Sequence, residues 1–226
     1  MNRDSNIYTI VYASVMVILV AFGLAFTSQS LKSYQKKNED IDKMKQILRS
    51  VRVQATAENA ESLYKELIKE SFLVDENGNK TEGDAFTTDV VKAFAGKKPL
   101  PVYVATVDGS TKYILCMQGA GLWGPLWGYL SIDDDKNTVF GSDFSHAGET
   151  PGLGAEIVTP AFSDQFKGKK LFNAEGECKS IAIVKPGKTA GGQDYVEGIS
   201  GGTLTSPGVN KMIFDSMSGY VKFLTS

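Results

Sequence analysis

The chain opens with a long apolar run. Residues 7–26 carry no charged side chain, and a helix of about 20 residues extends about 30 Å, the thickness of the hydrocarbon core of a bilayer. A cleaved signal peptide would have a shorter apolar region, about 7 to 15 residues, followed by a small-x-small site, and residues 27–30 match such a site poorly. The pattern therefore predicts an uncleaved transmembrane helix over residues 7–27, preceded by a short tail, residues 1–6.

An amphipathic pattern follows the apolar run. Apolar residues recur at helical spacing between Ser30 and Val53, with charged residues between them. This pattern predicts an amphipathic connecting helix over residues 28–53. Weaker helical patterns at residues 58–72 and 86–94 predict two more helices within residues 54–226, which are long enough to form a single domain.

The pattern changes to strand-like alternation after residue 100. Residues 102–107 and 112–117 are rich in β-branched and aromatic side chains, and Asp108-Gly109-Ser110 separates them. Two such runs around a glycine-containing turn predict a β-hairpin. Three further strands are predicted at residues 128–132, 138–144 and 178–184. Helices combined with an antiparallel sheet give an α+β fold.

A glycine- and hydroxyl-rich stretch precedes the last predicted helix. That helix carries apolar residues on one face, namely Val209, Met212, Ile213 and Met217. Ser206 is a favourable N-cap for it, and Pro207 fits its first turn. Residues 200–206 read Ser-Gly-Gly-Thr-Leu-Thr-Ser, so unpaired backbone N–H groups and the positive end of the helix dipole would face one point, which suits a phosphate. Alternatively, these hydroxyls only cap the helix.

Composition limits the cofactors that the chain could hold. The 24 basic and 26 acidic side chains give no reason to expect nucleic acid as a partner. One histidine, His146, cannot form a multi-histidine metal site, and Cys116 and Cys178 cannot supply the four ligands of an iron–sulfur cluster. No haem-attachment sequence is present. If the chain carries electrons, its cofactor must be organic.

The same three residues have simple structural interpretations. Cys116 lies in an apolar predicted strand and is expected to be buried. Cys178 follows a polar segment and is expected to be more exposed, and a disulfide between the two cysteines stays open for a domain outside the cytoplasm. For His146 we expect a hydrogen bond within its own loop, with a contact to the edge of a bound organic cofactor as the alternative.

Three motifs in order resemble a known family. Residues 194–206 are similar to the flavinylation sequence of the covalent FMN-binding domains in sodium-translocating NADH:quinone reductase and in Rnf complexes. Residues 119–123 and 149–154 resemble two glycine-rich loops of these domains, and residues 37–49 resemble the helix after the membrane anchor in the corresponding component of the reductase. The sequence departs from the flavinylation pattern at Glu197, where the family has aspartate, and at Gly202, where it has alanine.

The resemblance implies a covalent flavin. FMN would be attached to Thr203 through a phosphoester, placed there by a dedicated flavin transferase that uses FAD. The residues that would surround the attachment point are Ser200, Gly201, Leu204, Thr205 and Ser206, the last two as partners of the phosphate. The residues that would lie around the isoalloxazine ring are Trp123, Glu149, Thr150, Gly152, Leu153 and Gly154, with Leu153 packed on the ring.

The resemblance also implies a role in a larger assembly. The chain would be an electron-carrying subunit of a complex that oxidises NADH, reduces quinone and pumps sodium, with no complete activity of its own. Its partners would be the other subunits, the flavin transferase and the lipid bilayer. Consistent with this division of labour, the sequence contains no dinucleotide-binding fingerprint for NADH.

The predicted location follows from the same resemblance. The chain would sit in the bacterial inner membrane as a single-pass protein with its domain on the periplasmic side. The charges near the span favour the opposite orientation, because Arg3 precedes it and Lys32, Lys36 and Lys37 follow it. Two alternative functions stay open: the equivalent flavin subunit of an Rnf-type ferredoxin:NAD complex, and a non-redox, membrane-anchored binding module.

Overall fold

The computed structural model describes residues 6–96 and 99–226 and divides at Lys43 into two units. Helix α1 (Asn6–Ser50) contains both the predicted membrane span and most of the predicted connecting helix. Its last turns belong to the second unit, which begins at Met44, whereas the sequence pattern predicted the domain from residue 54. The second unit contains an antiparallel sheet with flanking helices, so the predicted α+β class is confirmed.

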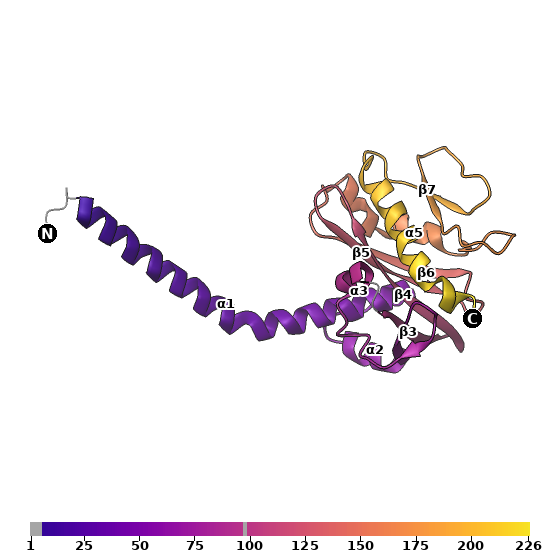
Figure 1. Cartoon of the computed structure of the whole chain (residues 1–226), viewed down its shortest axis with the longest axis horizontal. Helices are drawn as coiled ribbons and strands as arrows, with labels where there is room; N and C mark the ends of the chain where they lie inside the picture. Colours follow the sequence, from indigo (N-terminus) through magenta and orange to yellow (C-terminus); the bar gives the residue numbers. More distant parts are fainter. Residues whose placement is uncertain (1–5, 97–98) are drawn as a thin grey trace. The chain divides into compact units, whose positions relative to one another are not determined.

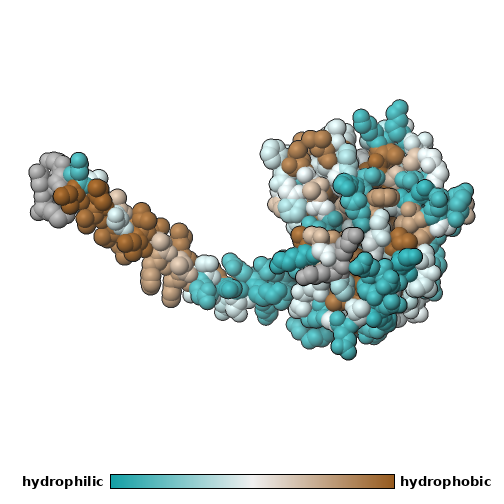
Figure 2. Space-filling view, in the orientation of Figure 1, coloured by the Kyte–Doolittle hydropathy of each residue, from teal (hydrophilic) through white to brown (hydrophobic). Residues whose placement is uncertain are grey.

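The first part of α1 has the surface of a membrane helix. Figure 2 shows apolar side chains gathered along its N-terminal half, followed by polar ones. Among the described residues, α1 is the one helix long and apolar enough to cross a membrane. At its polar end the Thr27 hydroxyl donates to the carbonyl of Gly23 at 2.8 Å, so this hydroxyl is satisfied within the helix. A continuous apolar surface of this length favours burial in lipid.

A six-stranded antiparallel sheet forms the centre of the second unit (Figure 1). Its order is β2-β1-β3-β4-β5-β6. The strands are β1 (Ile68–Val74), β2 (Lys80–Thr81), β3 (Leu100–Val107), β4 (Ser110–Ala120), β5 (Pro125–Ile132) and β6 (Val139–His146). The predicted hairpin is confirmed as β3–β4. Asp108 and Gly109 form its turn with φ angles of 50° and 75°, the positive values that a two-residue hairpin turn with the sheet's twist requires.

Two helix predictions before the hairpin were partly wrong. The helix predicted over residues 58–72 is α2 (Ala60–Leu67), and the chain then continues directly as β1. Residues of β1 pair with β3, and Phe72 and Val74 are buried on the same face of the sheet. The helix predicted over residues 86–94 is α3 (Val90–Gly96), because the Asp84 carboxylate accepts the N–H of Phe86 and holds that segment as a turn.

The strand predicted over residues 178–184 is also mostly wrong. Only β7 (Ala182–Val184) is a strand, and it pairs in parallel with β8 (Tyr195–Glu197). Ser180 interrupts the extended run because its φ is +61°. The backbone N–H groups of Lys179 and Ser180 both donate to the carbonyl of Leu171, which fixes a turn there.

The sheet has a different cover on each face. Helix α5 (Thr205–Leu224) lies across one face in Figure 1, and its predicted apolar residues are all buried there: Val209, Met212, Ile213 and Met217. Successive residues of β4 divide between the two cores, with Leu115 on the α5 side and Cys116 in the cluster that includes Ile47 of α1. This is the alternation expected of a strand buried on both faces. Three short helices follow β6, namely η1 (Gly154–Val158), α4 (Pro160–Ser163) and η2 (Asp164–Phe166).

The cysteines agree with the sequence interpretation. Cys116 is buried, as predicted, and Cys178 is half-buried. No disulfide joins them in the described part of the chain.

The end of α1 is fixed to the sheet by an ion pair. Arg49 Nε and Nη2 donate to the two carboxylate oxygens of Asp143 at 2.7 and 3.1 Å. Burial raises the pKa of the Asp143 carboxyl, although Arg49 opposes that rise. Removing the guanidinium would therefore leave a buried carboxylate without its charge partner.

We expect Arg49→Met to lower the free energy of unfolding by about 3 kcal/mol at pH 7, at the low end of the range for a broken buried pair because Arg49 is partly exposed. Denaturant titration of the detergent-solubilised chain measures this change in the free energy of unfolding. Without Arg49, the carboxyl of Asp143 binds a proton more tightly in the folded state than in the unfolded state. The loss of stability in Arg49→Met should therefore become smaller as the pH falls toward 4. Asp143→Asn in the same chain should recover most of the stability. An unchanged midpoint for the single variant would contradict this role.

Candidate functional site

Three loops meet at one end of the sheet. Residues 121–124 connect β4 to β5, residues 147–153 follow β6, and residues 198–204 precede α5. Pairing of Leu126 with His146 brings the first two loops together. Packing of α5 against β4 brings the third loop to the same place, where a side chain added at Gly208 would meet the backbone of Ala120. The three motifs of the sequence therefore form one site.

The carboxylate of Glu149 joins the three loops. Its Oε2 accepts a hydrogen bond from the Thr205 hydroxyl at 2.5 Å, and its Oε1 accepts one from the backbone N–H of Trp123 at 2.9 Å. Only 4% of Glu149 is exposed. Its own N–H donates to Nδ1 of His146 at 3.1 Å, so the prediction of a local loop bond for His146 is confirmed.

These bonds keep Glu149 ionised. Burial would raise the pKa of its carboxyl, but the hydrogen bonds from Thr205 and from the backbone of Trp123 lower it more, and the pKa lies below its ordinary value. The site thus has a fixed negative charge on its floor. A charge held by two donors is a rigid support for the loops that supply them.

Two glycines allow the loops to approach this carboxylate. A Cβ built on Gly121 would collide with Oε1 of Glu149, and a Cβ built on Gly154 would collide with the hydroxyl of Thr205. A side chain at either position would have to displace the Glu149 carboxylate or the Thr205 hydroxyl, and would so disturb the hydrogen bonds that join the loops. These contacts explain why glycine occupies positions 121 and 154, which the sequence motif alone did not explain.

The loops enclose a pocket of about 170 Å³. The lining residues are Leu122, Glu149, Thr150, Leu153, Gly154, Gly201, Gly202, Thr203, Leu204 and Thr205. Eight of these belong to the predicted site, and four predicted residues lie outside the lining: Trp123, Gly152, Ser200 and Ser206. Leu122 and Gly202 were missed as lining residues, although both stand inside the motifs that predicted the site.

Large apolar side chains surround this pocket and remain exposed. Leu122 is 48% exposed, Leu204 is 60% exposed and Trp123 is 66% exposed, and Leu153 is also exposed. We call these four residues the apolar rim. An apolar cluster of this kind on a soluble surface usually marks a binding site, and a flat aromatic ring would cover it.

The polar side of the pocket suits a phosphate. Thr203 is exposed in the turn that precedes α5, where a modifying enzyme can reach its hydroxyl. The 20-residue helix α5 begins two residues later, at Thr205, so its positive dipole end lies close to the Thr203 hydroxyl. The residues present therefore fit FMN: an exposed hydroxyl and a helix N-terminus for its phosphate, and an apolar rim for its ring.

Ser206 has a different role from the predicted one. Leu204 precedes the first residue of α5, and Ser206 lies inside the helix, so the N-cap prediction was wrong. Its N–H donates to the carbonyl of Gly202 at 2.9 Å, and its hydroxyl accepts the N–H of Ile199 at 3.0 Å. Both bonds hold the loop of residues 198–204 against the helix.

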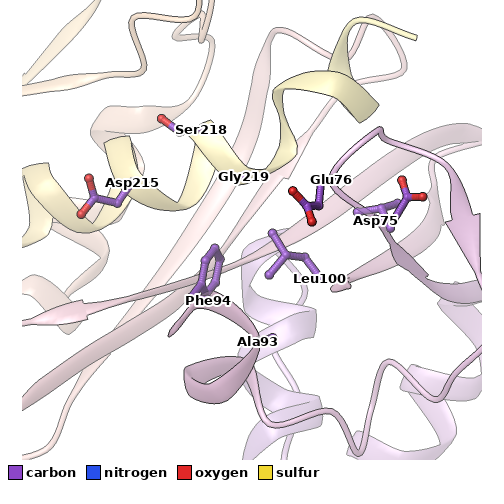
Figure 3. Close-up of a pocket in the computed structure, with 9 residues that line it drawn as sticks. Asp75, Glu76, Ala93, Phe94, Leu100, Asp215, Ser218 and Gly219 are labelled. Carbon is purple, nitrogen blue, oxygen red and sulfur yellow. The ribbon is translucent and has the colours of Figure 1, made fainter. Parts of the chain in front are cut away.

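A separate hollow of about 340 Å³ contains none of the predicted flavin residues. Figure 3 shows it between α3, the β1–β2 turn and α5. Asp75, Glu76 and Asp215 stand around an apolar floor that includes Phe94 and Leu100. The Asp75 carboxylate accepts hydrogen bonds from N–H groups of its own turn, so it stabilises that turn.

Comparisons with known proteins agree with the three-loop site. A family model described as an FMN-binding domain matches residues 121–218, which contain the pocket. The NqrC component of the Na(+)-translocating NADH-quinone reductase of Vibrio alginolyticus is 32% identical, with 92% of this chain and 89% of that protein covered. The NqrC protein of Pasteurella multocida is 32% identical, with 92% and 88% covered.

The chain belongs to the NqrC family.

Solved structures support the membership. The NqrC structure of Parabacteroides distasonis is 66% identical, with a TM-score of 0.84 over 87% of this chain and 98% of that one. The NqrC structure of Shewanella oneidensis is 22% identical, with a TM-score of 0.71 over 83% and 97%, and it shows the shared fold. Membership of the NqrC family favours a flavin-carrying subunit of a membrane reductase over the two alternatives considered from the sequence.

Proposed function

We propose that this member of the NqrC family relays electrons through FMN bound covalently to Thr203, within a complex that oxidises NADH, reduces quinone and pumps sodium. The observation that carries the proposal is the exposed Thr203 hydroxyl in a pocket that joins a helix N-terminus to the apolar rim. Attachment would form a P–O bond at Thr203 and break the pyrophosphate bond of FAD, with AMP as the leaving group and loss of the hydroxyl proton.

When bound, FMN supplies the electron-transfer chemistry. The chain's own residues bind and orient it. Thr203 fixes the phosphate end, and the N-terminus of α5 offers N–H groups and a partial positive charge to the phosphate. Leu122, Leu153 and Leu204, which line the pocket, would lie against the ring and shield it from water. The remaining predicted contacts, from Ser200, Gly152 and Trp123, belong to this proposal as surrounding loop residues.

The Glu149 carboxylate has two functions in this proposal. It holds the three loops in the arrangement that the ring needs, and it places a negative charge on the floor of the pocket. A nearby negative charge disfavours additional electron density on the bound ring. Glu149 would therefore contribute to a low flavin potential as well as to the shape of the site.

The proposed location is the periplasmic side of the bacterial inner membrane. The apolar part of α1 would anchor the domain in the bilayer, and the family's flavin transferase would meet the domain outside the cytoplasm. The lysines after the span favour the opposite side. The family resemblance supports the periplasmic side in spite of these lysines, because a large domain that follows a span can be translocated largely regardless of charge. The other subunits of the complex would donate and accept the electrons.

Mass spectrometry tests the covalent link. The full chain, produced together with a flavin transferase and FAD, should give a yellow band that fluoresces on a denaturing gel, and the peptide containing Thr203 should carry the added mass of FMN. An unmodified Thr203 peptide from such material would refute the proposed attachment.

The fluorescent band also tests the orientation. A protease that cannot cross the inner membrane, added to cells with a permeabilised outer membrane, should digest the fluorescent domain. Complete protection of the domain under these conditions would place it in the cytoplasm and contradict the periplasmic assignment.

A further inference from the structure

Residues 197–203 form an exposed stretch that ends at Thr203, just before α5. We call it the 197–203 segment. It contains three glycines, and one of them, Gly201, has a positive φ of 78°. Under the proposed function, a flavin transferase must bind this segment before it can transfer FMN. A glycine-rich segment loses conformational freedom when it is bound. Contacts that already hold it in one conformation would therefore favour the transfer.

The side chain of Gln165 holds the first residue of this segment. Its Oε1 accepts the backbone N–H of Glu197 at 2.9 Å, and its Nε2 donates to the backbone carbonyl of Glu197 at 3.2 Å. Glu197 is the last residue of β8, and the next residue, Gly198, donates its N–H to Val184 of β7 at 2.8 Å. The Gln165 amide therefore binds the edge of β8 that faces away from β7, in the place of a further strand.

Gln165 reaches the segment from a rigid support. It belongs to η2, and the residue after it, Phe166, is 0% exposed. The Phe166 ring packs against Phe144 of β6 and Phe162 of α4, with centroid distances of 5.0 and 5.4 Å. A closely packed aromatic cluster keeps its backbone in place. The Gln165 side chain is therefore held by the folded core and not by another loop.

The far end of the segment is fixed by α5. The N–H of Ile199 donates to the hydroxyl of Ser206 at 3.0 Å. The N–H of Gly202 donates to the carbonyl of Ile199 at 3.0 Å and closes a turn just before Thr203. Gln165 and α5 thus hold the segment at its two ends, with the exposed turn between them.

We propose that Gln165 is a positioning residue for the attachment of FMN: by binding the backbone of Glu197, it holds the 197–203 segment in the conformation that the flavin transferase binds. This inference rests on the proposed function. In the transfer, the Thr203 hydroxyl oxygen forms a bond to the phosphorus of the FMN half of FAD. The pyrophosphate P–O bond breaks, AMP leaves, and the hydroxyl proton passes to water. Gln165 acts on the conformation of the segment and not on the reacting atoms.

Gln165→Met tests this role in the full chain, with flavin transferase and FAD. Methionine is similar in length to glutamine but makes neither hydrogen bond. Only a fraction of the molecules would then present the segment correctly, so the KM of the transferase for this chain should rise about tenfold while kcat stays unchanged. Initial rates of fluorescence gain on denaturing gels measure both constants, at a temperature where unfolding curves show the variant and the parent fully folded.

Hydrogen exchange distinguishes positioning from a general loss of stability. In unmodified Gln165→Met, the N–H groups of Ile199 and Gly202 should exchange about tenfold faster than in the parent, although Gln165 binds neither of them. Exchange in the strands of the central sheet should stay at the parent rate.

Asn173→Ala is the matched control. Asn173 is half-buried like Gln165, and its Oδ1 accepts the N–H of a glutamate, Glu177, at 2.8 Å. This bond lies in a turn outside the 197–203 segment, so the variant should keep the KM of the parent. A KM raised equally by Asn173→Ala would overturn the proposal.

The outcomes separate this inference from the proposed function. A parent-like KM in Gln165→Met, or a fall in kcat alone, would overturn the role of Gln165 and leave the attachment at Thr203 in place. A parent chain that is never modified would overturn both. Should Gln165→Met not fold, Gln165→Glu decides. Its carboxylate can accept the N–H of Glu197 but has no donor for the carbonyl, so KM should rise about threefold, and a parent-like KM would overturn the proposal.

Discussion

Replacing Thr203 with valine should give a folded chain that carries no covalent FMN. Valine has nearly the shape of threonine but lacks the hydroxyl that the phosphoester needs, so modification should fall below detection, a loss of at least a hundredfold. Thr203 is exposed, and an exposed substitution outside packed regions changes stability by only about 0.5 kcal/mol. In-gel fluorescence and the mass of the Thr203 peptide measure the loss, and denaturant titration measures the stability.

Two variants serve as controls. Thr203→Ser restores a hydroxyl at the same position and should recover modification at least in part. Thr189→Val removes an exposed threonine hydroxyl outside the proposed flavin-binding residues and should leave the attachment intact. Flavin that stays covalently bound to the Thr203→Val variant, or modification lost equally in Thr189→Val, would contradict Thr203 as the acceptor.

Replacing Glu149 with alanine should disrupt the site from its floor. The change removes two hydrogen bonds to a charged group and leaves the buried Thr205 hydroxyl without an acceptor. Hydrogen bonds to charged groups contribute about 1.5–3 kcal/mol each, so we expect the free energy of unfolding to fall by about 3 kcal/mol at pH 7. Flavin attachment should slow because the loop before α5 is no longer held against the other two. Unfolding curves and the rate of fluorescence gain measure the two effects.

The pH dependence identifies the charge as the cause. The pKa of folded Glu149 lies below its ordinary value of 4.5, so the carboxylate contributes stability above that pH, and this contribution is lost as the pH falls through the folded pKa. Glu149→Gln should therefore be less stable than the parent at pH 7, and the difference should narrow below about pH 4. Glu156→Ala is the matched control, because Glu156 accepts one bond from the N–H of Gly152 on the same loop. A stability difference between Glu149→Gln and the parent that does not change with pH would exclude the carboxylate charge as its cause.

Local signals predicted some elements well. The β3–β4 hairpin depends on alternation and on a turn at Asp108-Gly109, and both are visible in neighbouring residues. Strand β1 was missed because its first residues continue the helical spacing of α2. Its identity as a strand depends on pairing with β3, about 30 residues later in the chain. Strand pairing over that distance cannot be predicted from a short window of sequence.

The candidate site shows the same difference between features visible in short segments and features that depend on the fold. The motif around Thr203 and the two glycine-rich loops were found because residue types in short segments carry the resemblance. The bond from Thr205 to Glu149 spans 56 positions and depends on the fold. The need for glycine at positions 121 and 154 also becomes visible only when a side chain is placed against that carboxylate. Sequence therefore located the loops, and the structure shows how one acidic side chain joins them.

The apolar rim has a consequence for how such a protein is made. Leu122, Trp123, Leu153 and Leu204 are open to water until a planar group lies on them, and open surfaces of this kind promote self-association. Under the proposed function, a chain that has not yet met a flavin transferase is therefore less soluble than the flavin-carrying chain. Recombinant production that omits that enzyme would enrich aggregates, so the timing of maturation bears on yield as well as on redox activity.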